Sequence, residues 1–325
     1  MLQISDCSNA SHRVRPSRHR PPLLAVLVIV SAGIGLGAPP LAEITLHGER
    51  LFPESVTSTS DGAIFAGSLA KHMVFKAAPG AAIAEPWISP GTNGLMDVLG
   101  VLADERAGTL WVCSSNRSGQ GEPTALKSFD LKTGTPKGSF PFPGEKSLCN
   151  DIAIGPDGTA YVTDTGNPRI LKLKPGGSAL EVWTTDDRFD SLDGIAFGND
   201  TTLYVNTVAS GHLFRIQMGR DGAAGRVTQL ALSGKLERPD GMRSIGDNQL
   251  LLVEGAGRLD RVSFDGDTAK IDVLKDGYNG PTAVTRVGNT AWVLEAKLAW
   301  MSDPKLKDQD PGPFKIYAVS LQQGK

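Results

Sequence analysis

The chain has 325 residues, of which 40% are hydrophobic and 21% charged, and its formal net charge is −2. This composition is that of an ordinary globular protein and excludes a collagen, a coiled coil or a disordered chain. The absence of a basic surplus argues against a nucleic-acid partner, because a protein that binds a phosphate backbone needs clustered cations.

The first 42 residues have the pattern of a secretory signal peptide. Four arginines and one aspartate precede an apolar run of 16 residues, Leu23–Ala38, and small residues follow it. The run is shorter than the roughly 20 residues that span a bilayer, so we expect a cleaved signal, with an uncleaved N-terminal anchor as the alternative. Cleavage after Ala42 leaves 29 basic and 34 acidic residues, a net charge of −5. We therefore expect a periplasmic or secreted protein with no stable membrane insertion after signal removal.

Two cysteines, Cys113 and Cys149, remain after the signal is removed. Their spacing is not the Cys-x-x-Cys of a metal site. An oxidising compartment permits a disulfide between them. Two separate buried thiols are the simpler expectation.

From residue 53 onward the chain repeats a hairpin pattern. Apolar residues at alternate positions, a turn with Asp-Gly or Asn-Asp, and a second apolar run are typical of a β-hairpin. The pattern is clearest in LCNDIAIGPDGTAYVTDT (148–165) and SLDGIAFGNDTTLYVNT (191–207), and four looser copies accompany them. Aligned copies share an anchor position at the start of the first strand, occupied by Glu54, Asp97, Asn150, Asp193, Asp240 and Thr282. Their intervals of 43, 53, 43, 47 and 42 residues predict a β-propeller with four strands in each blade.

The outer strands complete this prediction. Each hairpin is followed by a third strand, such as RILKLK or LFRIQM, and most by a fourth, such as ALEVWTT. The segment EITLHG (43–48) resembles a fourth strand but has no hairpin before it, whereas the final KIYAVSL lacks the strand that should follow it. Because an open sheet edge is unfavourable, EITLHG is predicted to pair with the last blade. Residues 43–325 are thus expected to form a single all-β domain, a six-bladed β-propeller closed by its N-terminal strand.

The anchors begin the innermost strands, so their side chains should converge on the propeller axis. Several carboxylates at one place repel one another and resist desolvation unless a cation compensates them. Oxygen donors of mixed charge suit Ca²⁺ better than Zn²⁺ or Cu²⁺. We interpret Glu54, Asn150, Asp193 and Asp240 as ligands of a divalent metal, calcium in the first place. In the alternative, the Asp residues before glycine are only turn residues, but Glu54 precedes a serine and has no such role.

These motifs carry a family resemblance. NDIAIGPDGTAYVTD, LDGIAFG and RPDGM, together with an early PES, resemble the senescence marker protein (regucalcin), gluconolactonase and luciferin-regenerating enzyme family over residues 43 to 322. The resemblance implies a six-bladed propeller with a divalent metal at its axis. It places the family's metal ligands on Glu54, Asn150, Asp193 and Asp240.

The sequence also departs from the family. Asp193 stands where asparagine is usual, and Leu148 stands where sugar-lactonase relatives carry a substrate-binding arginine. No histidine accompanies Asp97 in the sequence as in paraoxonases, and His47, His72 and His212 are expected to be ordinary surface residues. The polar insert Lys297–Phe314 is expected to be a solvated loop, although it has the length to cover the mouth of the propeller.

Two functions remain open at this point. The first is a metal-dependent hydrolase of a lactone or similar ester, a small-molecule substrate, in which the ion polarises the carbonyl. In that hypothesis Asp240 is a metal ligand and the general base, and Asp97 contacts the substrate. The second is a non-catalytic secreted propeller that binds a ligand or a protein and in which the metal is structural.

Overall fold

The computed structural model describes residues 41–199 and 201–321. Within them the protein is all-β, with a single turn of α-helix, α1 (Ala299–Ser302), and one 3-10 turn, Thr92–Gly94. The predicted signal segment lies outside the described residues, apart from Leu41 and Ala42. No helix in the described part of the chain is long and apolar enough to cross a membrane.

Three antiparallel sheets have four strands each, in chain order from the inside outwards. The first contains β6 (Asp97–Asp104), β7 (Thr109–Ser115), β8 (Ala125–Asp130) and β9 (Pro136–Pro141). The second contains β10 (Cys149–Ile154), β11 (Ala160–Asp164), β12 (Arg169–Leu173) and β13 (Glu181–Thr185). The third contains β14 (Leu192–Asn199), β15 (Thr202–Thr207), β16 (His212–Met218) and β17 (Ala224–Gln229).

A fourth sheet has five strands, ordered β18-β22-β21-β20-β19. Its strands are β18 (Ala231–Leu232), β19 (Pro239–Gly246), β20 (Gln249–Glu254), β21 (Arg258–Asp265) and β22 (Thr268–Lys275). The remaining eight strands form one sheet, ordered β2-β3-β4-β5-β1-β25-β24-β23. They are β1 (Glu43–Leu46), β2 (Pro53–Ser58), β3 (Ile64–Ser68), β4 (Met73–Ala77), β5 (Ile83–Ile88), β23 (Pro281–Val287), β24 (Thr290–Glu295) and β25 (Lys315–Ser320).

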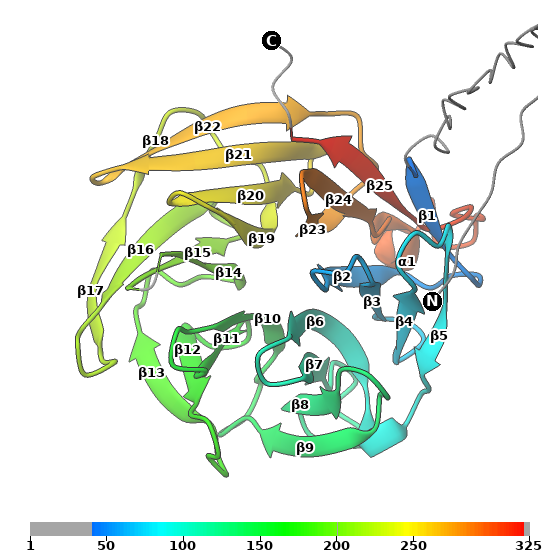
Figure 1. The fold of residues 1–325 in the computed structure, drawn as a ribbon, viewed down its shortest axis with the longest axis horizontal. Helices are drawn as coiled ribbons and strands as arrows, with labels where there is room; N and C mark the ends of the chain where they lie inside the picture. Colours follow the sequence, from blue (N-terminus) through cyan, green and yellow to red (C-terminus); the bar gives the residue numbers. More distant parts are fainter. Residues whose placement is uncertain (1–40, 200, 322–325) are drawn as a thin grey trace, which may run out of the picture. The chain divides into compact units, whose positions relative to one another are not determined.

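The innermost strands surround a common centre (Figure 1). Each contacts the next in the cyclic order β2, β6, β10, β14, β19 and β23, and β23 contacts β2. Hydrophobic clusters fill the space between neighbouring sheets; one, for example, joins Tyr161 and Ile170 to Leu203 and Phe214. The predicted hairpins and third strands are confirmed by the antiparallel pairing of β10 with β11 and of β11 with β12, and by the same pairing of β14, β15 and β16.

The N-terminal strand pairs as the sequence predicted. β1 runs antiparallel to β25, with Ile44 opposite Ile316. It also pairs in parallel with β5, with Thr45 opposite Ile83, and this second pairing was not predicted. A single short strand therefore joins the outer edges of the first and last groups of strands and leaves neither edge open there.

The insert between β24 and β25 is not a purely solvated loop, so that expectation was wrong. It contains α1, and its side chains Leu298, Trp300 and Met301 pack against the core. Two basic side chains hold the insert in place through hydrogen bonds. Arg50 donates to the carbonyls of Trp300 and Gln309, and Lys297 donates to those of Pro311 and Pro313. Apolar side chains within a polar stretch explain why part of this insert is buried.

The expectation of two separate thiols was also wrong. Cys113 on β7 and Cys149 on β10 form a disulfide, with their Cα atoms 5.1 Å apart. The two residues lie on neighbouring sheets, which face each other across a cluster that includes Leu99 and Ile152. Packing of one sheet on the next brings them together, and a spacing of 36 residues in sequence does not reveal it.

Loss of this disulfide is expected to lower stability clearly. A cross-link that closes a loop of 36 residues stabilises by about 3 to 4 kcal/mol in the chain-entropy description. We expect Cys113→Ser to lower the urea midpoint of unfolding, and the double variant Cys113→Ser/Cys149→Ser to behave alike. Wild-type protein treated with a reductant should match the variants, and an unchanged midpoint in all three would contradict a stabilising bond.

Candidate metal centre

Each inner strand carries a β-bulge near its first residue, and the bulge determines which side chain is re-aimed there. Bulges interrupt regular pairing and re-aim the extra residue. Pairing with the second strand shifts between Pro53 and Ser55 in β2, between Cys149 and Ile152 in β10, between Leu192 and Ile195 in β14, and between Pro239 and Met242 in β19. Glu54, Asn150, Asp193 and Asp240 are therefore the first bulged residues of their strands.

The glycines after Asp193 and Asp240 allow neighbouring inner strands to approach each other closely. A Cβ on Gly194 would lie 2.4 Å from the carbonyl oxygen of Asp240, and one on Gly241 would lie 2.7 Å from that of Thr282. Both glycines lie inside strands, β14 and β19. The alternative that these Asp-Gly pairs are turns is therefore wrong, since the glycine is needed for close approach of the neighbouring inner strand.

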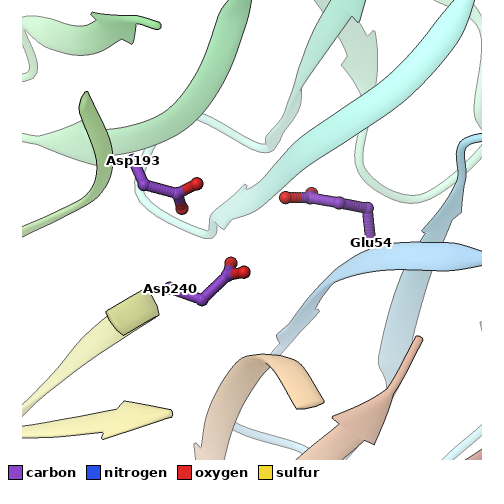
Figure 2. Close-up of side chains that lie close together, drawn as sticks. All are labelled: Glu54, Asp193 and Asp240. Carbon is purple, nitrogen blue, oxygen red and sulfur yellow. The ribbon is translucent and has the colours of Figure 1, made fainter. Parts of the chain in front are cut away.

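Three carboxylates meet at the centre of the ring (Figure 2). One oxygen each from Glu54, Asp193 and Asp240 lies within 4.8 Å of the others. Glu54 and Asp193 are 8% and 7% exposed, whereas Asp240 is more open. They line a cavity of about 10 Å³, roughly the room that one water-sized sphere needs.

Two neutral side chains, those of Asn150 and Thr282, also line this cavity. Asn150 donates from Nδ2 to Asp193 Oδ2 and to Thr165 Oγ1, each at 2.9 Å, which leaves its amide oxygen as the atom that can bind a cation. Thr282 Oγ1 is buried and has no hydrogen-bond partner among the described residues. Buried polar atoms are normally paired, so an unpaired hydroxyl here indicates a place for a ligand.

The raised pKa values of the carboxyl groups around the cavity also favour a bound cation. Burial raises the pKa of Glu54 well above its usual value, and repulsion by Asp193 and Asp151 adds to the effect. Burial and then the Asp151 charge raise the pKa of Asp193 to about 7. Burial followed by the charges of Asp193 and Glu54 raises the pKa of Asp240 as well. A bound divalent ion would lower these pKa values, because it favours the charged form of every carboxylate around it. The all-oxygen donor set fits calcium.

Asp151 introduces a further charge next to the cavity, and Arg243 compensates it. The guanidinium binds both carboxylate oxygens, with Nη1–Oδ2 at 2.9 Å and Nη2–Oδ1 at 3.1 Å. It also donates to the carbonyls of Met242 and Val101, and Ile195 N donates to Asp151. Asp151 lines the small cavity, and Arg243 lines a larger one of about 560 Å³. The ion pair therefore stands between the two, and sequence reasoning missed it.

The structure corrects the anchor of the second repeat. In β6 the pairing shift lies between Val98 and Val101, so Leu99 is the equivalent of the other anchors and Asp97 is not. Gly100 follows Leu99, and a Cβ on it would lie 2.2 Å from the carbonyl oxygen of Asn150, the relation that Gly194 has to Asp240. Aligning on this glycine instead of on the acid reveals the register in the sequence.

Asp97 lies outside the lining of the metal cavity, at the first residue of β6. Its Oδ1 is 2.8 Å from His72 Nε2, and its Oδ2 is 3.8 Å from Arg117 Nε. His72 follows β3, in the turn that leads to β4, and was expected to be an ordinary surface residue. Its side chain is 40% exposed, and it also contacts Asp97, because the loop after β3 brings the two together from positions 25 apart in sequence.

Solved structures share this fold. A gluconolactonase from Xanthomonas campestris superposes with a TM-score of 0.63 at 16% identity, covering 85% of this chain and 89% of its own. A calcium-binding protein, regucalcin, from Agrobacterium tumefaciens gives 0.62 at 15% identity, with 86% and 95% covered. A luciferin-regenerating enzyme gives 0.63 at 12% identity, with 84% and 92% covered.

The structural resemblance predicted from the motifs is thus confirmed. No protein-family model matches the chain, and no curated protein matches it. At these identities the likeness establishes the fold, and the activity has to be argued from the site.

Proposed function

We propose that this protein is a calcium-dependent hydrolase of a lactone or related ester, built on a six-bladed propeller. In this description the eight-stranded sheet comprises the first and last blades, joined through β1. The convergence of Glu54, Asp193 and Asp240 on one small cavity carries the proposal, because three carboxylates so close together, two of them buried, need a cation. The unpaired Thr282 hydroxyl and the free oxygen of Asn150 support it.

The residues of the site would have different roles in the reaction. Glu54, Asn150, Asp193 and Asp240 hold the ion, which when bound supplies a Lewis acid for the substrate carbonyl and its developing oxyanion. Asp240 is also the general base, since it is the most exposed of the three carboxylates and Gly241 N holds its Oδ1 at 3.0 Å. From that position its second oxygen accepts a proton from the attacking water. Asp97, oriented by His72, contacts the substrate.

We also propose that the mature protein works in the periplasm or outside the cell, on a small-molecule substrate. The N-terminal basic and apolar segments support this location. The Cys113–Cys149 disulfide supports it independently, because such bonds persist in oxidising compartments.

Calcium is expected to raise the melting temperature of the mature protein by several degrees relative to protein in chelator. A ligand that binds only the native state stabilises it by about 2.7 kcal/mol at 100 times its Kd. Elemental analysis should find one ion per chain, and Glu54→Gln should reduce the shift at the same calcium concentration. Equal melting with calcium and chelator, with no bound metal, would refute the site.

Catalysis is tested separately with a panel of lactones and aryl esters in calcium, manganese, zinc and chelator. Turnover that chelator abolishes and calcium restores supports the hydrolase. A metal-dependent melting shift with no turnover of any member of the panel would instead favour a binding propeller with a structural ion.

A further inference from the structure

One sector of the ring around the metal cavity is apolar. Leu99 occupies the bulge position that Glu54, Asn150, Asp193 and Asp240 hold in their own strands. It lies in the ring between Glu54 on β2 and Asn150 on β10, because β6 contacts both of these strands. The ring of bulge positions thus holds a leucine between two candidate oxygen ligands, and Leu99 itself lies outside the lining of the small cavity.

Leu148 extends this apolar sector. It precedes the ligand Asn150 by two residues and packs against the cluster that contains Leu69, Leu99 and Cys149. Leu69 itself follows β3 and is 6% exposed, as is Leu99. Leu148 is only partly buried, so its side chain has surface left for a ligand.

The insert adds the third part of the sector. In an antiparallel sheet whose first strand starts at the anchors, the loop between the second and third strands returns to the anchor end. The β24–β25 insert is such a loop, and so is the β3–β4 turn that carries Leu69 and His72. Leu298 and Met301 pack both against the cluster beneath β1, β2 and β25 and against the cluster of Leu69 and Leu99. The insert therefore reaches across to the sheet that contains Leu99.

The two basic side chains that hold the insert have partners within the protein, because Arg50 and Lys297 donate to its carbonyls. Asp97, which the proposed function places against the substrate, also contacts His72 and Arg117. A polyhydroxylated substrate would have to exchange its hydrogen bonds with water for contacts with leucine and methionine. Burial of polar groups without partners is unfavourable, whereas burial of alkyl groups there is favourable.

We propose that Leu148, Leu298 and Met301, packed on the buried side chains of Leu69 and Leu99, form an apolar rim that selects a lactone or ester with an alkyl or aryl body over a sugar lactone. This inference rests on the proposed hydrolase function and specifies its substrate class. The carbonyl of such a substrate would face the metal ligands, and its apolar body would lie along the rim.

The test is a series of γ-lactones with side chains of zero, four and eight carbons, together with glucono-δ-lactone, on calcium-loaded protein. We expect kcat/KM to rise about tenfold for every four carbons, below the limit of about fourfold for each fully buried CH₂ group. Calorimetry with the matching γ-lactams, which resist hydrolysis, measures binding independently of turnover and should show the same order.

Leu148→Arg is expected to remove the dependence on side-chain length, both of kcat/KM for the lactones and of the affinity for the lactams. Met301→Ser is a milder second variant, expected to lower the slope about threefold, in case the arginine disturbs folding. Val182→Arg is the matched control, because Val182 is 48% exposed on β13 and distant in the sheet order from the inner strands. It should leave the series unchanged.

The outcomes separate the two proposals. Lactam binding that strengthens with chain length in the absence of turnover supports the rim and contradicts the hydrolase. Turnover that is independent of chain length, or that favours glucono-δ-lactone, supports the hydrolase and overturns the rim. Binding of no lactam at any chain length overturns the rim as well.

Discussion

Replacement of Asp240 by asparagine is expected to lower kcat about 100-fold at saturating calcium, the order of effect that a general base has. Asparagine keeps the shape of the side chain and one oxygen that can bind the ion, but it cannot accept a proton. Calcium affinity should also fall, because one negative charge leaves the cavity. The measurement is kcat across a calcium titration with any substrate that the lactone panel identifies.

Glu54→Gln is the control for this experiment. Glu54 lies in the same cavity and is more deeply buried than Asp240, so its charge should matter for holding the ion and not for proton transfer. Its rate should recover largely with excess calcium. If Asp240→Asn recovers equally, Asp240 is a ligand only, and Asp97 with its partner His72 becomes the next candidate for the base.

Replacement of Arg243 by methionine is expected to lower the free energy of unfolding by about 3 kcal/mol or more, because removing one member of a buried ion pair leaves the other uncompensated. Asp151 is 6% exposed in its side chain and would then face Glu54 and Asp193 without a counter-charge. Urea unfolding in the presence of calcium measures the change.

Two further variants separate charge from packing. Asp151→Asn combined with Arg243→Met should recover much of the loss, since no buried charge is then left unpaired. Lys270→Met, which removes an exposed ion pair with Asp272, should change stability little, because water screens such pairs. A loss of similar size for Lys270→Met, or none for Arg243→Met, would contradict the role assigned to the buried pair.

Local signals were sufficient to predict most of the strands. The hairpins around Asp157-Gly158 and Asp61-Gly62 could be located because turn residues and alternating apolar residues act over a few neighbours in sequence. Gly62 and Gly158 indeed have positive φ angles, 96° and 86°, which glycine adopts without strain. The pairing of β1 with β25 was also predictable. The last repeat lacked a fourth strand, and the N-terminal segment EITLHG had the pattern of one.

The convergence of the candidate metal ligands was predictable because these residues recur at one place in a repeated unit. Glu54, Asn150, Asp193 and Asp240 each begin an inner strand, and the repeat alone was enough to predict that their side chains converge. The repeat failed at Asp97, where an acidic residue was aligned with the anchors. The β-bulge places Leu99, two residues later, at the anchor position. The glycine after Leu99, and not the acid, marks this register in the sequence.

By itself, then, the sequence determined the order of the strands, their hairpins, the closing pair and four inward-facing oxygen donors. These follow from short-range periodicity and from the recurrence of one pattern along the chain. Only the tertiary structure decided which side chains of different repeats touch. It joined Cys113 to Cys149, placed Arg243 against Asp151 at a separation of 92 residues, and brought His72 to Asp97. The physical reason is that these contacts form between the faces of stacked sheets, whose rotation and spacing depend on the packing of every side chain between them.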